Sequence, residues 1–330
     1  MLSHICCDLW RERCYQSPLP SRLLQLGGVG GDKIEDPVAA QTCTPRRRCR
    51  WDVQVVADGT PALSMETVPR TRGRTTLDDP VIYDVVDGVA WLTINRPHSR
   101  NALSVAVRQG LWDGARRFNE DADARVLVLT GAGEKAFCAG GDLKEMAHQA
   151  LAVPPLDFAP QFGRNIDIAK PTIAAVNGVA FAGGFLLAQQ CDLIVAAEHA
   201  LFAITEVKVG RGAPWAAPLS WLVPPRIALQ MMLTGEPISA ARAFEVGLVN
   251  EVVPAARLRD RAQKLGALIA GNAPLSVLAA KQTAYLSARH RLEEAYTLAE
   301  KIWEPVYHSA DAQEGPRAFR EKRAPVWRGR

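Results

Sequence analysis

Two pairs of adjacent glycines stand where helices are expected to begin. Gly140-Gly141 precedes a helix that starts near Asp142, and Gly183-Gly184 opens an apolar segment. The first amide groups of a helix have no partner inside it and carry its positive end. Two such amides that converge could hold an oxygen atom that gains negative charge during a reaction. The alternative interpretation is that these glycines only permit tight turns or close packing.

Another glycine loop follows the apolar run 126–130 and matches the G-x-G-x-x-A spacing of a dinucleotide-binding fingerprint at Gly131, Gly133 and Ala136. In a true fingerprint the third small residue lies in a helix packed on the sheet, and an acidic residue ends a second strand about 20 residues later. Prolines 154 and 155 occupy the place of that strand. We therefore predict no nicotinamide or flavin cofactor.

Strands and helices that alternate along the chain would position these loops. Two β-branched runs, 81–86 and 89–94, are separated by Asp87-Gly88, which predicts a β-hairpin. Ser104 is expected to be the N-cap of an amphipathic helix that extends to about Asn119. Buried strands are expected at 126–130, 172–176 and 192–196. The alternation predicts βα units around a largely parallel sheet.

From Trp215 onward the sequence has an almost entirely helical period. Ser239 is expected to cap a helix that ends at Gly247, and one short strand is expected at 248–253. The tail is predicted to be helical at 292–306 and 316–322.

The composition is that of a globular protein. Of 330 residues, 48% are apolar and 22% are charged, which suffices for a large core. The net charge of +4 is small and the signs are mixed, so no nucleic-acid or membrane partner is expected. No apolar stretch reaches the roughly 20 residues that cross a bilayer. Residues 1–10 lack the pattern of a secretory signal, so we expect a cytoplasmic protein in a reducing compartment.

Residues 1–79 show neither a strand nor a helix period, which predicts a poorly ordered N-terminal extension. This segment contains five of the seven cysteines and the arginine-rich run 46–50. We interpret it as a solvated tail. The alternatives are a targeting or anion-binding element, or a translation start at Met65.

The sequence contains no pattern typical of a metal site or of a serine nucleophile. The cysteines lack C-x-x-C spacing, and no H-E-x-x-H or EF-hand pattern is present. The histidines are scattered, and none pairs with a serine in a nucleophile elbow. We expect no metal.

Three segments carry a resemblance to a known family. They are 137–146 (FCAGGDLKEM), 177–184 (NGVAFAGG) and 233–240 (LTGEPISA), and they resemble the enoyl-CoA hydratase/isomerase (crotonase) family in order and spacing. Residues 95–103 are similar to the family's opening motif, and 314–323 to its C-terminal segment.

This resemblance implies a crotonase (ClpP-like) α/β fold. Residues 80–255 would form a core of repeated ββα turns in a spiral, and residues 256–330 would form a helical region that assembles a homotrimer or hexamer. The resemblance also implies an acyl-CoA thioester substrate. Coenzyme A would be part of that substrate, and no separate cofactor is expected.

The family pattern also implies site residues. The amides of Gly141 and Gly183 would form an oxyanion hole for the thioester oxygen. Trp215 would be a wall of the acyl pocket, and Phe319 and Lys322 would lie near the adenosine end of coenzyme A. The remaining substrate-binding positions would be Arg100, Ala102, Leu103, Ala139, Gly140, Asp142, Leu143, Ala182, Gly184, Thr205 and Pro214.

The number of carboxylates at the site decides the reaction. Family hydratases use two glutamates, and the first of their positions is Leu186 here while the second is Glu206. One carboxylate can collect a proton from C2 of a 3-enoyl thioester and return it to C4. The chain therefore resembles the single-glutamate Δ3,Δ2-enoyl-CoA isomerases, with Glu206 as catalytic acid and base.

Two other functions stay open. Asp157 or Asp167 could supply a second acid, which would give an enoyl-CoA hydratase. A catalytically inactive crotonase-fold protein that only binds a partner is an alternative of another class.

Overall fold

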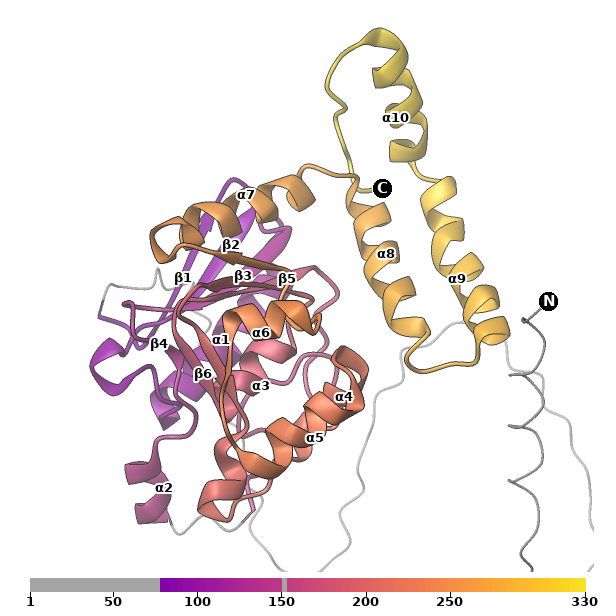
Figure 1. Ribbon diagram of the computed structural model, residues 1–330. Helices are drawn as coiled ribbons and strands as arrows, with labels where there is room; N and C mark the ends of the chain where they lie inside the picture. Colours follow the sequence, from indigo (N-terminus) through magenta and orange to yellow (C-terminus); the bar gives the residue numbers. More distant parts are fainter. Residues whose placement is uncertain (1–77, 150–152) are drawn as a thin grey trace, which may run out of the picture. The chain divides into compact units, whose positions relative to one another are not determined.

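A computed structural model describes residues 78–149 and 153–330 (Figure 1). The predicted extension 1–79, with its arginine-rich run and cysteines, lies outside the described residues except for its last two positions.

The larger sheet begins with the predicted hairpin. Strands β1 and β2 pair antiparallel from Val81 opposite Ile94 to Val86 opposite Val89. Asp87 and Gly88 both have positive φ angles, 51° and 76°, as a two-residue type I′ turn requires. The hairpin prediction is confirmed at both boundaries. The strands of this sheet are β1 (Val81–Val86), β2 (Val89–Ile94), β3 (Val126–Gly131), β5 (Thr172–Val176), β7 (Leu193–Ala197) and β10 (Glu251–Val253).

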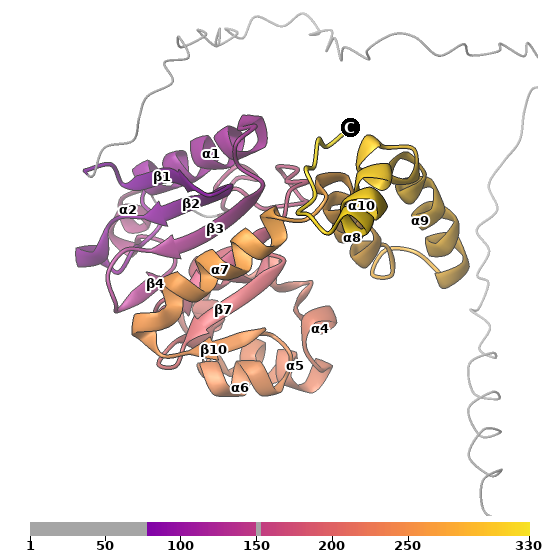
Figure 2. The same ribbon diagram turned by 90° about the horizontal axis from the view of Figure 1, so that it is seen from above.

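All pairs after the hairpin are parallel, in the order β2-β3-β5-β7-β10. Residues that alternate along each strand face two separate apolar clusters, as the period of two of a strand requires. Leu127 and Leu129 face the cluster that contains α1 (Val105–Glu120), and Val126 and Val128 face α7 (Leu258–Ala270). Figure 2 shows α7 lying along one face of this sheet. The predicted α/β class and largely parallel sheet are confirmed.

A second, four-stranded sheet has the order β4-β6-β8-β9. Its strands are β4 (Ala136–Cys138), β6 (Val179–Phe181), β8 (Leu201–Ala203) and β9 (Ile238–Ser239). The first three are parallel, and β9 is antiparallel to β8. Because β9 and β10 both fall after Trp215, the expectation of one strand in that region was wrong by one. The predicted strand 248–253 is shorter, at Glu251–Val253.

Side-chain caps set the starts of several helices. Ser104 Oγ accepts from Val107 N, and Ser239 Oγ accepts from Arg242 N, so both predicted N-caps are confirmed. The other α-helices are α2 (Leu143–Gln149), α3 (Gly183–Gln189), α4 (Leu219–Leu222), α5 (Pro225–Thr234), α6 (Ala240–Glu245), α8 (Pro274–Leu286), α9 (Leu292–Tyr307) and α10 (Ala310–Glu321). Short 3₁₀ helices are η1 (Pro97–Ser99), η2 (Thr205–Val209), η3 (Pro214–Ala216) and η4 (Ala255–Arg257). No helix of the described chain has the length and apolar content to cross a membrane.

A polar cluster joins α8 to the larger sheet. Lys281 Nζ lies 2.9 Å from Asp192 Oδ2, and it donates to the carbonyls of Ile168 and Lys170. Tyr285 donates its hydroxyl to Asp192 Oδ1 at 2.8 Å. The Lys281 and Asp192 side chains are 16% and 17% exposed, so their pairing is only weakly screened by solvent.

We predict that Lys281→Met lowers the free energy of unfolding by about 2–4 kcal/mol, because it leaves a largely buried carboxylate without its cation. Lys264→Met is the matched control, since Lys264 and Asp260 form an exposed helical pair worth less than about 0.5 kcal/mol. Urea unfolding of both variants measures the difference. Equal losses in the two variants would contradict the anchoring role of Lys281.

Candidate functional site

Three adjacent parallel strands lead into the predicted site. β6 lies between β4 and β8, with Ala180 opposite Cys138 and Phe181 opposite Ala203. Shortly beyond the ends of β4, β6 and β8 the chain reaches Gly141, Gly183 and Glu206, respectively. Parallel neighbours end at the same edge of a sheet, which is where ligands bind in open α/β folds. The fold therefore delivers both glycines and the carboxylate to one edge.

The loop after β4 is hydrogen-bonded to the segment that precedes α1. We call this contact between residues 100–103 and 139–142 the clasp. Leu103 N donates to Gly140 O at 2.8 Å, and Ala139 N donates to Arg100 O at 3.0 Å. Asp142 forms an ion pair of 3.3 Å with Arg96, whose guanidinium also reaches Ala102 O. The structure thus brings the predicted residues Arg100, Ala102 and Leu103 against the predicted segment 139–142.

The buried side chain of Asn101 stabilises this clasp through hydrogen bonds. It has a positive φ of 56°, and its Nδ2 donates to the carbonyls of Ala132 and Ala136 at 3.0 and 2.7 Å. Its Oδ1 accepts from Arg96 N at 3.0 Å. Asn101 was not among the predicted site residues, although it belongs to the opening motif of the resemblance.

The two glycine loops approach each other too closely for side chains. A Cβ on Gly140 would lie 2.8 Å from Ala182 Cβ and 3.0 Å from Phe181 O, and Gly140 has a φ of 96°. A Cβ on Gly184 would lie 1.9 Å from Cys138 O. Close packing therefore explains Gly140 and Gly184 fully. It does not explain Gly141, whose added Cβ would meet only the flexible Met146 side chain at 2.6 Å.

The amides of Gly141 and Gly183 are available to a ligand. Within residues 78–149 and 153–330, neither N–H donates a hydrogen bond. Ala182, directly before Gly183, has a φ of 50° and a ψ of −122°, a conformation that non-glycine residues rarely adopt. Such strain persists only where the surroundings enforce it, and here Ala182 N is bound to Ala203 O. The backbone at this turn is thus fixed with the Gly183 amide unpaired.

Glu206 is the carboxylate of the site and is only 9% exposed. Trp215 Nε1 donates to its Oε1 at 3.0 Å, while Oε2 is buried with no hydrogen-bond partner among the described residues. Burial raises the pKa of Glu206, and hydrogen bonds from its own backbone amide and from Trp215 partly oppose that rise. A carboxyl group with a raised pKa and one unoccupied oxygen is suited to proton transfer.

Gln189, at the end of α3, is a residue that the sequence reasoning missed. Its Nε2 donates to Trp215 O at 2.7 Å, and its side chain is buried. The available signal was the polar pair Gln189-Gln190 in an otherwise apolar helix.

The first hydratase position and the possible substitute acids lie in different surroundings. Leu186 is buried in α3 and is 8% exposed. Asp157 and Asp167 are both exposed, and in the described chain only their backbone carbonyls accept side-chain hydrogen bonds, from Trp112 and Asn119. Among the described residues, no interaction joins the carboxylate of Asp157 or of Asp167 to Glu206.

The remaining predicted residues divide into two groups. Thr205 and Pro214 lie on η2 and η3 beside Glu206 and Trp215, and Leu143 begins α2. Phe319 lies on α10 with 87% of its side chain exposed, and Lys322 follows that helix. No hydrogen bond or ion pair among the described residues connects these two to the glycine loops. Their place near the adenosine of coenzyme A stays a prediction.

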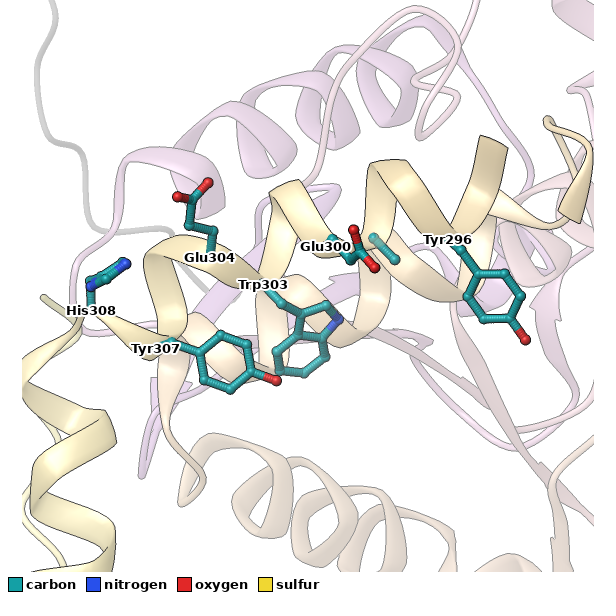
Figure 3. Close-up of a pocket in the computed structure, with 7 residues that line it drawn as sticks. Tyr296, Glu300, Trp303, Glu304, Tyr307 and His308 are labelled. Atoms are coloured by element: carbon teal, nitrogen blue, oxygen red, sulfur yellow. The ribbon is translucent and has the colours of Figure 1, made fainter. Parts of the chain in front are cut away.

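A separate groove of about 430 Å³ lies along α9. Its lining includes Tyr296, Trp303 and Tyr307, which Figure 3 shows on one side of this helix. None of the predicted site residues lines it. In the described ranges no group of three or more histidine, cysteine or acidic side chains is arranged to hold a metal ion.

Similarities to known proteins identify the family of this chain. The family model described as enoyl-CoA hydratase/isomerase matches residues 84–330. The chain is 40% identical over 254 residues to (E)-benzylidenesuccinyl-CoA hydratase of Thauera aromatica, covering 76% of this chain and 99% of that protein. It is 40% identical over 249 residues to carnitinyl-CoA dehydratase of Salmonella typhi, covering 72% and 94%.

A solved structure shows the same architecture. The crystal structure of an enoyl-CoA hydratase from Mycobacterium marinum superposes with a TM-score of 0.70 at 39% identity, over 77% of this chain and all of that one. The predicted crotonase fold is confirmed by this similarity.

We predict that Gly184→Ala destabilises the protein by about 3 kcal/mol or more, because the new methyl group would overlap a backbone carbonyl that cannot rotate away. Gly212→Ala is the control, since Gly212 is exposed, its Cβ would make only an ordinary contact of 3.8 Å with Pro214, and the protein's stability should change by less than about 0.5 kcal/mol. Thermal unfolding distinguishes the two. A Gly184→Ala protein as stable as the parent would show that the loops are not packed as described.

Proposed function

The chain belongs to the enoyl-CoA hydratase/isomerase family, and on that premise we propose that it shifts the double bond of an unsaturated acyl-CoA thioester, with Glu206 as its single acid and base. The observation that carries this proposal is the pairing of one buried carboxylate with Leu186 at the position where family hydratases have their other glutamate. The described structure offers no other carboxylate joined to Glu206 or its partners.

In this proposal the amides of Gly141 and Gly183 receive the thioester oxygen. Their N–H groups are unpaired in the described structure, and they follow neighbouring strands. Hydrogen bonds to that oxygen stabilise the negative charge that develops when C2 loses a proton. Fixed backbone donors do this without reorganising, which makes C2 acidic enough for a carboxylate to deprotonate.

Glu206 then moves one proton. Its carboxylate takes a proton from C2 of a 3-enoyl thioester, and the electron pair spreads over a dienolate. The resulting carboxylic acid returns the proton to C4, which gives the 2-enoyl product and restores the carboxylate. The raised pKa of Glu206 supports both halves of the cycle, because the acid and base forms are then closer in energy near neutral pH.

The binding of the rest of the substrate is part of the same proposal. Coenzyme A would lie along the clasp formed by residues 100–103 and 139–142, with the acyl chain against Trp215. Phe319 and Lys322 would reach the adenosine end, and the helices after residue 256 would assemble a trimer or hexamer.

Hydration of a 2-enoyl thioester is the second candidate, and the names of the relatives favour it. Two proteins 40% identical to this chain are named as a hydratase and a dehydratase. One carboxylate can also serve in that chemistry, by taking a proton from the water that adds to C3 and then delivering that proton to C2. Losing one of two acids typically lowers the rate of a reaction about 10²–10⁴-fold, so hydration and isomerisation would differ in rate.

We predict that Glu206→Gln lowers kcat at least about 100-fold with a 3-enoyl-CoA substrate, because the amide cannot accept the C2 proton. The assay follows formation of the conjugated 2-enoyl thioester. Glu198→Gln is the matched control, since Glu198 is exposed at the end of β7 and should leave the rate unchanged. Full activity in Glu206→Gln would remove Glu206 from the mechanism. Faster hydration of a 2-enoyl-CoA than isomerisation of a 3-enoyl-CoA by the parent protein would favour the second candidate.

We also predict that Leu186→Glu increases hydration of a 2-enoyl-CoA by roughly tenfold or more, because it restores a second acid at the family position. Leu186→Gln is the control for the loss of apolar packing. Product analysis by mass spectrometry measures the ratio of hydrated to isomerised thioester. An equal ratio in the two variants would show that position 186 does not face the reacting carbons.

A further inference from the structure

Helix α3 contacts Trp215 at two points. The Phe185 ring, near the start of the helix, meets the indole edge-on with a centroid distance of 6.0 Å and an interplanar angle of 85°. Gln189, at the end of the helix, donates from Nε2 to the Trp215 carbonyl at 2.7 Å. One contact fixes the ring and the other fixes the backbone, so together they define the orientation of Trp215 relative to α3.

Trp215 in turn holds one oxygen of Glu206. Its Nε1 donates to Oε1 at 3.0 Å, and an indole nitrogen is only a donor. The partner oxygen, Oε2, is buried without a hydrogen bond in the described chain. The two oxygens of this carboxylate are therefore not equivalent.

We propose that Trp215 and Gln189 are positioning residues that fix Glu206 relative to the Gly183 amide and leave Oε2 as the oxygen that carries the proton. The inference rests on the proposed function for the identity of the proton carrier. Its geometric basis is that α3 begins at Gly183 and ends at Gln189. A helix of this length is a rigid spacer of about 1.5 Å per residue. Helix α3 thus carries the oxyanion amide at one end, and at the other end it holds the backbone of Trp215, whose indole binds the carboxylate.

The same hydrogen bond favours the ionised base. A donor to a carboxylate stabilises its charged form, which opposes the effect of burial. Neither α3 nor η3 carries a charged side chain. On η2 and on α5, which packs against it, the charged groups besides Glu206 are Lys208 and Arg226, and Arg211 follows η2. Lys208 is paired with Glu236 at 2.6 Å. The Trp215 indole donates directly to the Glu206 carboxylate, and it therefore helps to keep Glu206 ready to accept a proton.

The test compares Trp215→Phe, Gln189→Met and Trp303→Phe. Trp215→Phe keeps an aromatic ring beside Phe185 and removes the N–H. Gln189→Met keeps the indole and frees the Trp215 backbone. Trp303→Phe makes the same chemical change at a tryptophan whose N–H is bound to Thr283, away from the glycine loops. Each variant is assayed as kcat/KM against pH with the 3-enoyl-CoA substrate.

We expect Trp215→Phe to shift the acidic limb of the profile to higher pH, because a charge-assisted hydrogen bond to the ionised carboxylate is lost. At pH values on the acidic side of that limb, kcat/KM should fall by roughly tenfold or more. Gln189→Met should shift the limb in the same direction by less, and Trp303→Phe should not shift it. A purely structural role of Trp215 would lower activity equally at all pH values. An unmoved limb in both Trp215→Phe and Gln189→Met would overturn the proposal.

A measurement without substrate separates this inference from the proposed function. Infrared difference titration of the protein against Glu206→Gln isolates the Glu206 carboxyl band. The band should titrate at higher pH in Trp215→Phe and in Gln189→Met than in the parent. If Glu206→Gln retains activity while this shift occurs, the proposed function fails and the positioning role stands. If Glu206→Gln is inactive and the titration does not move, the positioning role fails alone.

Discussion

The parallel pairing of β4, β6 and β8 is the constraint on which the site depends. Each strand is only three residues long, yet the chain that leaves each one reaches a residue of the proposed machinery within three positions. The middle strand, β6, leads to Gly183. In the order of the strands, the Gly183 amide therefore lies between the Gly141 amide and the Glu206 carboxylate. The close approach of the glycine loops, the clasp formed with residues 100–103 and the strained Ala182 all serve to hold this arrangement.

Placing a carboxylate in this edge has a cost for the fold. Burial raises the Glu206 pKa, so the folded protein binds that proton more tightly than the unfolded chain does. The contribution of Glu206 to the free energy of unfolding therefore falls as the pH rises from the ordinary carboxyl range through the raised pKa. The Trp215 hydrogen bond offsets part of this cost. The role proposed for Glu206 thus opposes stability, as is common where a site needs an ionisable group away from water.

The sequence predicted best those features whose cause is local. Asp87-Gly88 specifies its turn, and Ser104 and Ser239 supply side-chain caps, so their positions were right to the residue. The smaller sheet was invisible to periodicity because a strand of three residues has no period to detect. The family resemblance pointed to Glu206 and the glycines, but it did not indicate Gln189, whose proposed role depends on a contact with Trp215 across 26 residues of sequence. The resemblance also named Phe319, but its side chain is exposed on α10 and its role near coenzyme A stays a prediction.

In the proposed function, the Gly141 and Gly183 amides polarise a thioester carbonyl in front of Glu206. The most direct measurement of that polarisation is the infrared spectrum of a carbonyl-¹³C-labelled 3-enoyl-CoA bound to the Glu206→Gln protein, in which turnover is expected to be blocked. The carbonyl stretch should move to lower frequency than in free substrate, because two hydrogen bonds weaken the C=O bond. A bound substrate whose carbonyl stretch equals that of free thioester in water would contradict it.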